Sequence, residues 1–317
     1  MGRMIILTPL SDRFIQGLSL SNVEMVLYTL GGNDTVYLNR VDIFGGGNRV
    51  ETGSGRDRVE NYKEFGNLIV LGSGDDTYVG RGFGNGRGNP YDLVYGGTGN
   101  DIMSVQTFKS RYFGEDGDDA FFSVGWQNTF NGGSGIDSIS YGQRTQDPDQ
   151  GDTGVTVNLA QGFARTGRNQ TETLISIENA AGSGNDDTII GSRGANRIEG
   201  AGGVDDLTGG AGADTFVFSR VSHSQIENRQ IDLIFDFRRS EGDKIDLSAI
   251  DANENRPGMQ NFAFIGEAAF SGRAGELRIQ SLSDGVRITG DVDGDRRADL
   301  FIGVLDMASL RASDFIL

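Results

Sequence analysis

The residues of this chain best suited to chemistry are aspartates at a fixed place in a nine-residue pattern. The pattern Gly-Gly-x-Gly-x-Asp-x-apolar-x occurs as GGTGNDIMS from Gly96, GGSGIDSIS from Gly132 and GGAGADTFV from Gly209. Repetition at a fixed period indicates a solenoid in which each copy stacks on the next. Carboxylates at one offset then lie side by side, and calcium prefers oxygen ligands of this kind.

Weaker copies fill the sequence between these three. They are LGGNDTVYL from Leu30, TGSGRDRVE from Thr52, LGSGDDTYV from Leu71, GEDGDDAFF from Gly114 and GAGGVDDLT from Gly200. Glycine adopts the positive φ of tight turns, so its carbonyl can turn toward an ion. We therefore predict several Ca²⁺ ions bound by the loop glycines and the sixth-position aspartates. The predicted metal residues are Asp34, Gly53, Gly55, Asp57, Gly72, Gly74, Asp76, Gly97, Gly99, Asp101, Gly117, Asp119, Gly133, Gly135, Asp137, Asp187, Gly203, Asp205, Gly210, Gly212 and Asp214.

The half-turns between the strong copies lack the aspartate. Their sixth positions hold Asn48, Asn67, Ser110 and Asn128, and we interpret these asparagines, with Asn39, as turn residues because asparagine tolerates left-handed geometry without charge. The spacings from Asp57 through Asp76, Asp101 and Asp119 to Asp137 are 19, 25, 18 and 18 residues. Residues 43–140 should therefore carry ions mainly along one face. The block around Asp187, Asn196, Asp205 and Asp214 could load both faces.

Short strands must hold these loops. Each nonapeptide divides into a six-residue loop and a three-residue strand whose middle side chain points inward, because side chains alternate along a strand. The middle positions are Val59, Tyr78, Met103, Phe121, Ile139, Leu207 and Phe216. The predicted fold is all-β, a parallel β-roll or calcium-binding β-solenoid. The 25-residue step contains RGFGNGRGNPYDL from Arg81, which we expect to form a loop that leaves the stacking intact.

Composition limits the function classes. The formal net charge of −17 argues against nucleic acid and anionic membranes as partners. The chain has no cysteine and one histidine, His223, which excludes disulfides and most zinc chemistry. No stretch reaches transmembrane length, and no N-terminal signal peptide is recognisable.

The repeats resemble those of the repeats-in-toxin (RTX, haemolysin-type) family. Residues 182–317 also resemble the C-terminal half of serralysin-type secreted metalloproteases, through the runs GSRGANRIEGAGGVDDLTGGAGADTFVF, IDLIFDFRRSEGDKIDLSAID and DVDGDRRADLFIGVL. The resemblance implies a C-terminal β-rich capping and secretion domain. It also implies bacterial type I export through the C-terminus, here ending Asp314-Phe315-Ile316-Leu317, with the secretion machinery as a partner.

Five segments are expected. They are an N-terminal cap at 1–28, an irregular RTX roll at 29–140, a non-repeat β insertion or cap at 141–181, a second RTX block at 182–217 and the serralysin-like domain at 218–317. Strands are expected in GVTVNL and TLISIEN of the insertion. Met1 favours a complete small protein.

The sequence favours a protein that is not an enzyme. The H-E-x-x-H-x-x-G-x-x-H, G-x-S-x-G and G-x-x-x-x-G-K-[ST] motifs are all missing. We expect a secreted calcium-binding protein that folds after export and acts as an extracellular or surface-associated structural or adhesive component, with matrix polysaccharide as a candidate partner. One alternative is the carrier and export half of a larger secreted enzyme.

A second alternative is a polysaccharide-modifying enzyme on the roll. Its candidate aromatics are Tyr62, Phe65, Tyr112, Phe113, Phe122 and Trp126. Most of these are expected to pack inside the roll or along its edge, and no aromatic platform for sugar is expected around Trp126.

The acidic run DVDGDRRAD contains Asp291, Asp293, Asp295 and Asp299. It resembles a calcium loop but lacks the terminal glutamate of an EF-hand. The pattern favours a solvated hairpin turn over a metal site.

Overall fold

The chain folds into two compact units built almost wholly of β-strands. The computed structural model describes residues 3–16, 24–38, 47–62, 66–82, 91–144, 153–167, 170–224 and 231–317. The first unit comprises Met1–Arg144 with Gly162–Ile177, and the second comprises Thr145–Gln161 with Glu178–Leu317. Among the described residues, the helices are short 3-10 turns, including η3 (Val221–His223) and η4 (Ala312–Asp314). No described helix has the length and apolar character needed to cross a membrane.

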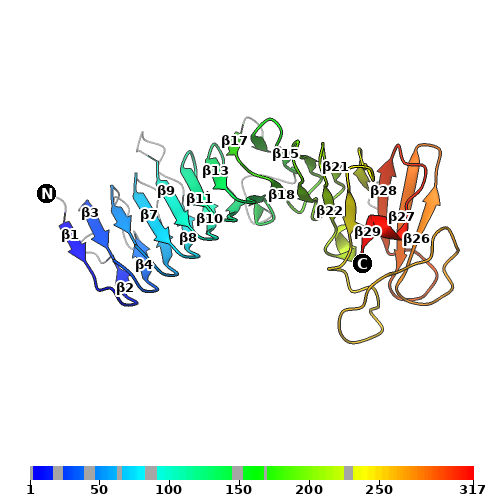
Figure 1. Cartoon of the computed structure of the whole chain (residues 1–317), viewed down its shortest axis with the longest axis horizontal. Coiled ribbons are helices and arrows are strands. Elements are labelled where there is room, and N and C mark those ends of the chain that lie inside the picture. Colours follow the sequence, from blue (N-terminus) through cyan, green and yellow to red (C-terminus); the bar gives the residue numbers. More distant parts are fainter. Residues whose placement is uncertain are drawn as a thin grey trace. The chain divides into compact units, whose positions relative to one another are not determined.

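The first unit is a parallel β-roll with two sheets. One sheet contains β1 (Arg3–Ile6), β3 (Met25–Tyr28), β5 (Arg49–Glu51), β7 (Leu68–Ser73), β9 (Leu93–Thr98), β11 (Arg111–Asp116), β13 (Thr129–Ser134), β16 (Phe163–Gly167) and β17 (Gln170–Ile175). The other contains β2 (Arg13–Ile15), β4 (Thr35–Leu38), β6 (Arg58–Asn61), β8 (Thr77–Arg81), β10 (Ile102–Gln106), β12 (Ala120–Ser123) and β14 (Ser138–Ser140). The strands follow one another in sequence order along the stack (Figure 1).

Strand register follows the repeat. Val59 of β6 lies beside Tyr78 of β8, and Tyr78 lies beside Met103 of β10, although the second step spans 25 residues. The loop expected after Arg81 therefore leaves the stacking intact, as predicted; residues 83–90 within it lie outside the described residues.

One or two inward apolar side chains from most strands form the core; β4, for example, buries Val36 and Leu38. All seven middle positions predicted from sequence are buried, from Val59 to Phe216. Burying such a side chain contributes about 1.5–3 kcal/mol. A roll only two sheets thick has few of them for each glycine-rich loop that must be ordered, so the loops need another source of stability.

The second unit begins as a roll and ends in an antiparallel sheet. Its first sheet contains β15 (Thr156–Asn158), β19 (Thr188–Ile190), β21 (Asp206–Thr208), β23 (Asp232–Ile234), β28 (Leu300–Leu305), β27 (Gly285–Asp291), β26 (Glu276–Ser281) and β25 (Ala263–Phe264). Its second contains β18 (Asn179–Ala181), β20 (Arg197–Glu199), β22 (Thr215–Val217), β24 (Lys244–Asp246) and β29 (Phe315–Ile316). β28 joins the two parts because it pairs in parallel with β23 and antiparallel with β27.

The non-repeat segment contributes strands to both units. β15, from GVTVNL, pairs with β19 of the second unit, whereas β17, which includes the start of TLISIEN, pairs with β13 of the first. β16 forms an antiparallel hairpin with β17. At the other end of the first unit, β1 pairs in parallel with β3 and β2 with β4. The five-segment division stays a prediction.

Candidate metal sites

The sixth-position aspartates of the first unit form a buried ladder. Asp34, Asp57, Asp76, Asp101, Asp119 and Asp137 each expose 2% or less of their surface. In each pair of adjacent coils, the backbone N–H of one aspartate donates to Oδ1 of the next. The distance is 2.7 Å from Asp34 N to Asp57 Oδ1 and 2.8 Å from Asp101 N to Asp119 Oδ1. The repeat therefore fixes one carboxylate oxygen at every coil.

The second carboxylate oxygen lacks a hydrogen-bond donor in most of these aspartates and in two equivalent aspartates of the second unit. Within the described part of the chain, Oδ2 is buried and accepts no hydrogen bond in Asp34, Asp57, Asp76, Asp101, Asp119, Asp205 and Asp214. Leaving a buried polar atom unsatisfied costs about 1–3 kcal/mol, and more when it carries charge. A row of such atoms at equivalent positions indicates a cationic ligand.

Carbonyl oxygens converge on the same positions. A Cβ built on Gly96 would collide with Asp101 Oδ2 and lie 2.7 Å from the Gly114 carbonyl oxygen of the next coil. A Cβ on Gly114 would collide with Asp119 Oδ2 and lie 2.6 Å from a carbonyl oxygen in the following coil. Each glycine thus leaves open a small space faced by a carboxylate and a carbonyl. These hard oxygen ligands fit Ca²⁺.

The other loop glycines shape this space. Gly97 and Gly99 have φ values of 115° and 123°, and a Cβ on Gly97 would collide with the Gly72 carbonyl of the preceding coil. All twelve glycines predicted as metal residues adopt positive φ: Gly53, Gly55, Gly72, Gly74, Gly97, Gly99, Gly117, Gly133, Gly135, Gly203, Gly210 and Gly212. Their role as carbonyl ligands stays a prediction, while their conformation explains why the loops need glycine.

Burial changes the acidity of the ladder. Desolvation, and to a smaller extent neighbouring carboxylates, raise the pKa of Asp76 and Asp101 to about 7. Desolvation and the Asp187 charge raise the pKa of Asp205 to about 9. Without a cation, these groups therefore resist ionisation at neutral pH.

The weak half-turns form a different ladder, closed by hydrogen bonds. The Asn48 N–H donates to Asn67 Oδ1, and the Ser110 N–H donates to Asn128 Oδ1 at 3.0 Å. Asp92 completes this row. Its buried carboxylate accepts hydrogen bonds from Asn61 Nδ2 at 2.6 Å and from the Asn67 N–H at 2.8 Å. These contacts support the interpretation of the asparagines as structural residues; Asn39 lies outside the described residues.

The second unit has ladders on both faces. On one face the Asp187 N–H donates to Asp205 Oδ1, and the Asp205 N–H donates to Asp232 Oδ1 at 2.9 Å. Asp187 differs from the other strong aspartates because its Oδ2 accepts a hydrogen bond from the Ser183 N–H. Its own carboxylate is thus satisfied by the protein. Its role as a metal ligand stays a prediction.

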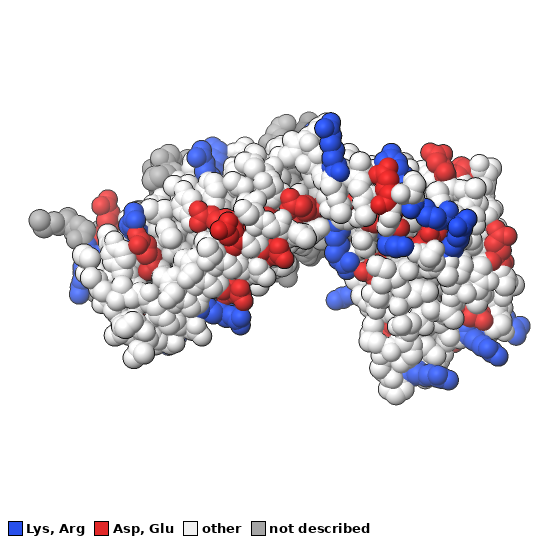
Figure 2. Space-filling view, viewed as in Figure 1, with Lys and Arg blue, Asp and Glu red and all other residues white. Residues whose placement is uncertain are grey.

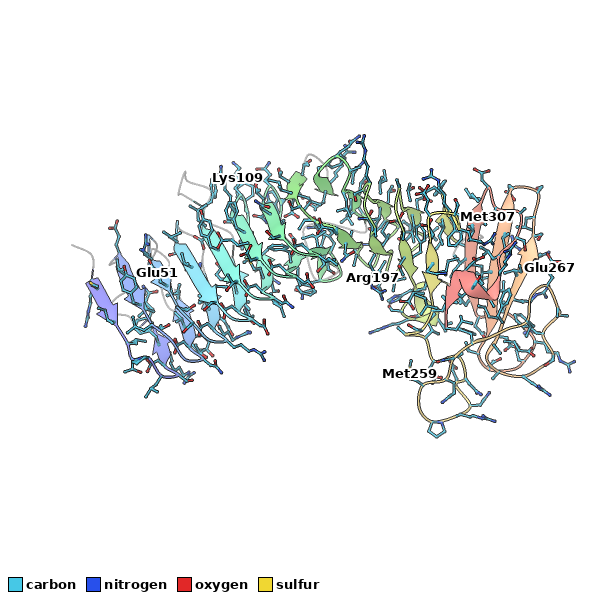
Figure 3. The ribbon with its side chains drawn as sticks, viewed as in Figure 1. Glu51, Lys109, Arg197, Met259, Glu267 and Met307 are labelled. Atoms are coloured by element: carbon cyan, nitrogen blue, oxygen red, sulfur yellow. The ribbon has the colours of Figure 1, made fainter. Side chains whose placement is uncertain are left out.

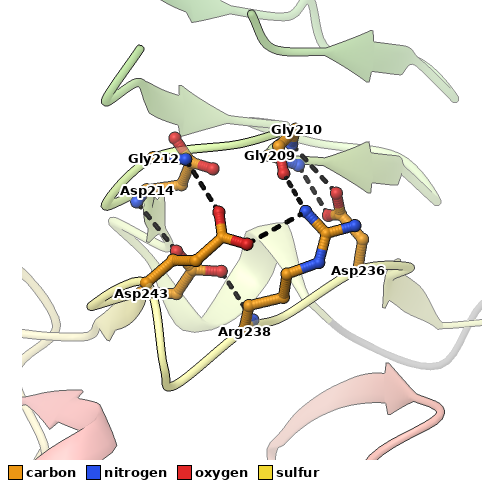
Figure 4. A network of polar contacts seen from close by, with 8 residues as sticks. Gly209, Gly210, Gly212, Asp214, Asp236, Arg238 and Asp243 are labelled. Carbon is orange, nitrogen blue, oxygen red and sulfur yellow. Dashed lines mark hydrogen bonds and ion pairs between the residues drawn. The ribbon is translucent and has the colours of Figure 1, made fainter. Parts of the chain in front are cut away.

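On the opposite face the Asn196 N–H donates to Asp214 Oδ1, and the Asp214 N–H donates to Asp243 Oδ1 at 3.0 Å. The loop that follows the last repeat closes this ladder (Figure 4). There Asp236 accepts from the Gly209 and Gly210 N–H groups, and Glu241 accepts from the Gly212 N–H.

Sequence reasoning missed four ladder aspartates. Asp12 donates its N–H to Asp34 Oδ1, while Asp92, Asp232 and Asp243 accept from the preceding coils. None of the four stands at the sixth position of a glycine-rich nonapeptide. Each does begin an Asp-x-apolar tripeptide at the start of a strand, and that shorter pattern could have found them.

The acidic run after β27 is a hairpin turn, as the sequence favours. Asp291, Asp293 and Asp299 each bring a carboxylate oxygen within 4.8 Å of the others. The turn's own backbone occupies them, because Asp291 accepts from the N–H groups of Gly294 and Arg296 at 2.6 and 3.0 Å.

Two glycines of one loop allow a matched test of the space that glycine leaves open beside a ladder carboxylate. Gly200→Ala places a Cβ against Asp205 Oδ2, whereas a Cβ on Gly202 meets no heavy atom closer than 3.7 Å. We expect Gly200→Ala to raise the calcium concentration at half-folding about tenfold. We expect Gly202→Ala to change it little. Equal midpoints for the two variants in a calcium titration followed by circular dichroism would contradict a calcium site beside Asp205.

Comparisons with known families match both parts of the chain. The family described as Peptidase M10 serralysin C terminal matches residues 166–317. The family described as RTX calcium-binding nonapeptide repeat (4 copies) matches residues 91–105, which include the Gly96 loop. No curated protein matches the chain.

These matches agree with the ladder geometry. The repeats indicate Ca²⁺ binding, and the two families are typical of extracellular proteins exported by type I secretion. Both matched regions are of the non-catalytic, repeat and secretion kind. The chain thus contains RTX calcium-binding nonapeptide repeats and, over residues 166–317, a serralysin-type C-terminal domain.

Proposed function

We propose that this protein is exported unfolded by a type I machine, folds when it meets extracellular calcium, and acts as a non-enzymatic structural or adhesive component outside the cell. The row of buried Oδ2 atoms carries the proposal. A fold that holds such a row without a cation is unstable, so binding free energy becomes folding free energy. Extracellular calcium modules have dissociation constants of about 10⁻⁴–10⁻³ M, which keeps the chain unfolded in the cytosol.

The C-terminus supports export before folding. Asp314 accepts hydrogen bonds from Arg239 at 2.8 and 2.6 Å, and Phe315 is buried in β29 beside β24. A secretion machine could read the final residues only while this strand is undocked. Folding after export therefore suits a C-terminal address.

Retention on an extracellular matrix tests the adhesive role. Calcium-loaded protein should stay with insoluble matrix prepared from the producing cells, and EDTA should release it because the roll unfolds. Matrix polysaccharides incubated with the protein should yield no new reducing ends. Either a matrix that does not retain the protein or a steady release of reducing ends would contradict the proposal.

A further inference from the structure

A groove lined by one aromatic ring and two cations lies on the first unit, and none of the sixth-position aspartates lines it. Its volume is about 450 Å³, within the range of small-molecule sites. The side chains that would meet a ligand are Tyr91, Leu93, Lys109, Arg111, Gln127 and Thr129. Asp92 also lines it, but its carboxylate is hydrogen-bonded to Asn61 and Asn67 in the interior.

Aromatic rings on successive coils lie beside the groove, and Tyr91 among them lines it. Tyr91 meets Phe108 edge-on with ring centroids 6.1 Å apart, and Phe108 lies 5.3 Å from Trp126. The sequence predicts no aromatic platform for sugar around Trp126; Phe108 nevertheless lies beside its ring, and a platform there is part of the proposal below. Stacking at the 18-residue period brings the two rings together, and residues 108 and 126 also form a parallel bridge. Adjacent strands are about 4.8 Å apart, close to one sugar unit of an extended polysaccharide.

A second pair of rings continues the surface along the same sheet. Tyr95 of β9 stacks on Phe113 of β11 with centroids 4.8 Å apart and planes 9° apart. Both side chains are half-buried on the outer face, because they alternate with the buried Val94 and Tyr112. The other candidate aromatics do not join this surface. Tyr112 is buried in the roll, and Phe65 lies outside the described residues.

Two cations face the groove. Lys109 Nζ lies 5.6 Å from the Tyr91 ring centroid and 4.8 Å from that of Phe108 (Figure 3). Neither Lys109 nor Arg111 forms an ion pair with any described residue. The chain carries a net charge of −17, and acidic side chains recur along the face of the first unit in Figure 2. Lys109 and Arg111 therefore offer two positive charges, without a carboxylate partner among the described residues, next to the Tyr91 ring.

The backbone under the groove is strained. Lys109 and Gln127 occupy equivalent positions in successive coils with φ values of 62° and 58°, where the earlier coils carry Gly47 and Gly66 at 66° and 75°. A side chain with positive φ costs about 1 kcal/mol or more relative to glycine. Strain of this kind is concentrated at functional sites.

We propose that this groove binds an acidic polysaccharide, a chain of sugar rings that carry carboxylates. The rings give flat apolar faces for sugars, Gln127 and Thr129 give hydrogen-bonding groups for hydroxyls, and Lys109 with Arg111 pair the acid groups. The net charge of −17 disfavours every polyanion at long range, so the preference for a polysaccharide over a nucleic acid rests on the hydroxyl-binding groups of Gln127 and Thr129. The proposal deepens the adhesive function and rests on it.

Trp126 is the only tryptophan, and it lies next to Phe108 beside the groove, so its emission can report on a ligand bound there. Hexagalacturonate, which is too short to gel with calcium, should change Trp126 emission saturably when added to the calcium-loaded protein. Neutral maltohexaose should bind at least about tenfold more weakly. Equal binding of maltohexaose, tighter binding of a single-stranded oligodeoxynucleotide, or unchanged emission would overturn the assignment.

Matched variants separate this groove from general charge effects. Lys109→Ser with Arg111→Ser should weaken hexagalacturonate binding about tenfold or more, as should Phe108→Ala. Arg56→Ser with Arg58→Ser removes the same charge elsewhere on the roll, and Phe122→Ala removes another outward ring. Both controls should bind as the parent does. Equal losses in groove and control variants, with circular dichroism unchanged, would overturn the proposal.

The matrix test distinguishes the two proposals. If the matrix retains the groove variants as well as the parent, the groove assignment fails while the adhesive function stands. If hexagalacturonate binds but is cleaved into new reducing ends, the groove stands and the non-enzymatic function fails.

Discussion

Chelation of calcium at pH 8 is expected to unfold both rolls. The cause is the ladder of buried carboxylates: without the ion, Asp101 and Asp119 leave Oδ2 atoms unsatisfied in adjacent coils, and their charges repel each other. Glycine-rich loops add the largest backbone entropy loss of any residue type. The core has only one or two inward apolar side chains from most strands to oppose these terms.

Far-UV circular dichroism gives the measurement. EDTA should abolish the β-sheet signal, and calcium should restore it in a cooperative transition at about 10⁻⁴–10⁻³ M. Magnesium is the matched control. Because it demands strict octahedral geometry and dehydrates reluctantly, it should restore little of the signal. An equal response to both ions would argue against specific sites.

Protonation of the ladder carboxyl groups is expected to stabilise the calcium-free fold in part. A carboxyl group whose pKa is raised on folding stabilises the fold while it is protonated. This stabilisation is complete below about pH 4, the unfolded value, and is lost as the pH rises through the folded value. Burial puts the folded pKa at about 6 for Asp119 and Asp214, about 7 for Asp76 and about 9 for Asp205. The stabilisation by protonated carboxyl groups is therefore lost gradually between about pH 4 and about pH 9.

Chelated protein at pH 5.5 should thus recover β-sheet signal that it lacks at pH 8, with a urea midpoint higher by about 1 M or more. Calcium should show the opposite dependence and bind more weakly at pH 5.5, because protons compete for the same oxygens.

Two neighbouring residues provide the control for the acid effect. Asp76→Asn removes a buried ladder carboxyl and should reduce the pH dependence of the chelated protein. Asp75→Asn changes an exposed carboxylate whose pKa is lowered by hydrogen bonds from the Asn100 N–H and from Arg56, so it should leave that dependence intact. Identical pH profiles for both variants would show that the pH dependence comes from the overall charge of the protein and not from the ladder carboxyl groups.

The repeat made most of the fold predictable. A fixed period sets both which side chain points inward, as at Tyr78 and Met103, and which carboxylates align, as at Asp101 and Asp119. The nonapeptide also led to the positive φ of its glycines. These features depend only on local sequence and on the stacking of identical units.

Features that depend on distant contacts could not be read from the repeat. Glu172 is buried and accepts hydrogen bonds from Ser123, Asn128 and Tyr141, which are 31 to 49 residues away. No periodic pattern marks such a partner. β15 belongs to the second unit because it pairs with β19, whereas β16 and β17 belong to the first because β17 pairs with β13. The repeat does not predict these pairings either.

A crystal structure of the calcium-loaded protein with an anomalous difference map tests the central claim most directly. Anomalous peaks are predicted within about 2.3–2.6 Å of Asp101 Oδ2 and Asp119 Oδ2, each facing a carbonyl of the next coil, with equivalent peaks at Asp205 and Asp214. Peaks confined to exposed carboxylates such as Asp75, or a folded calcium-free roll with no peak along the ladder, would contradict it.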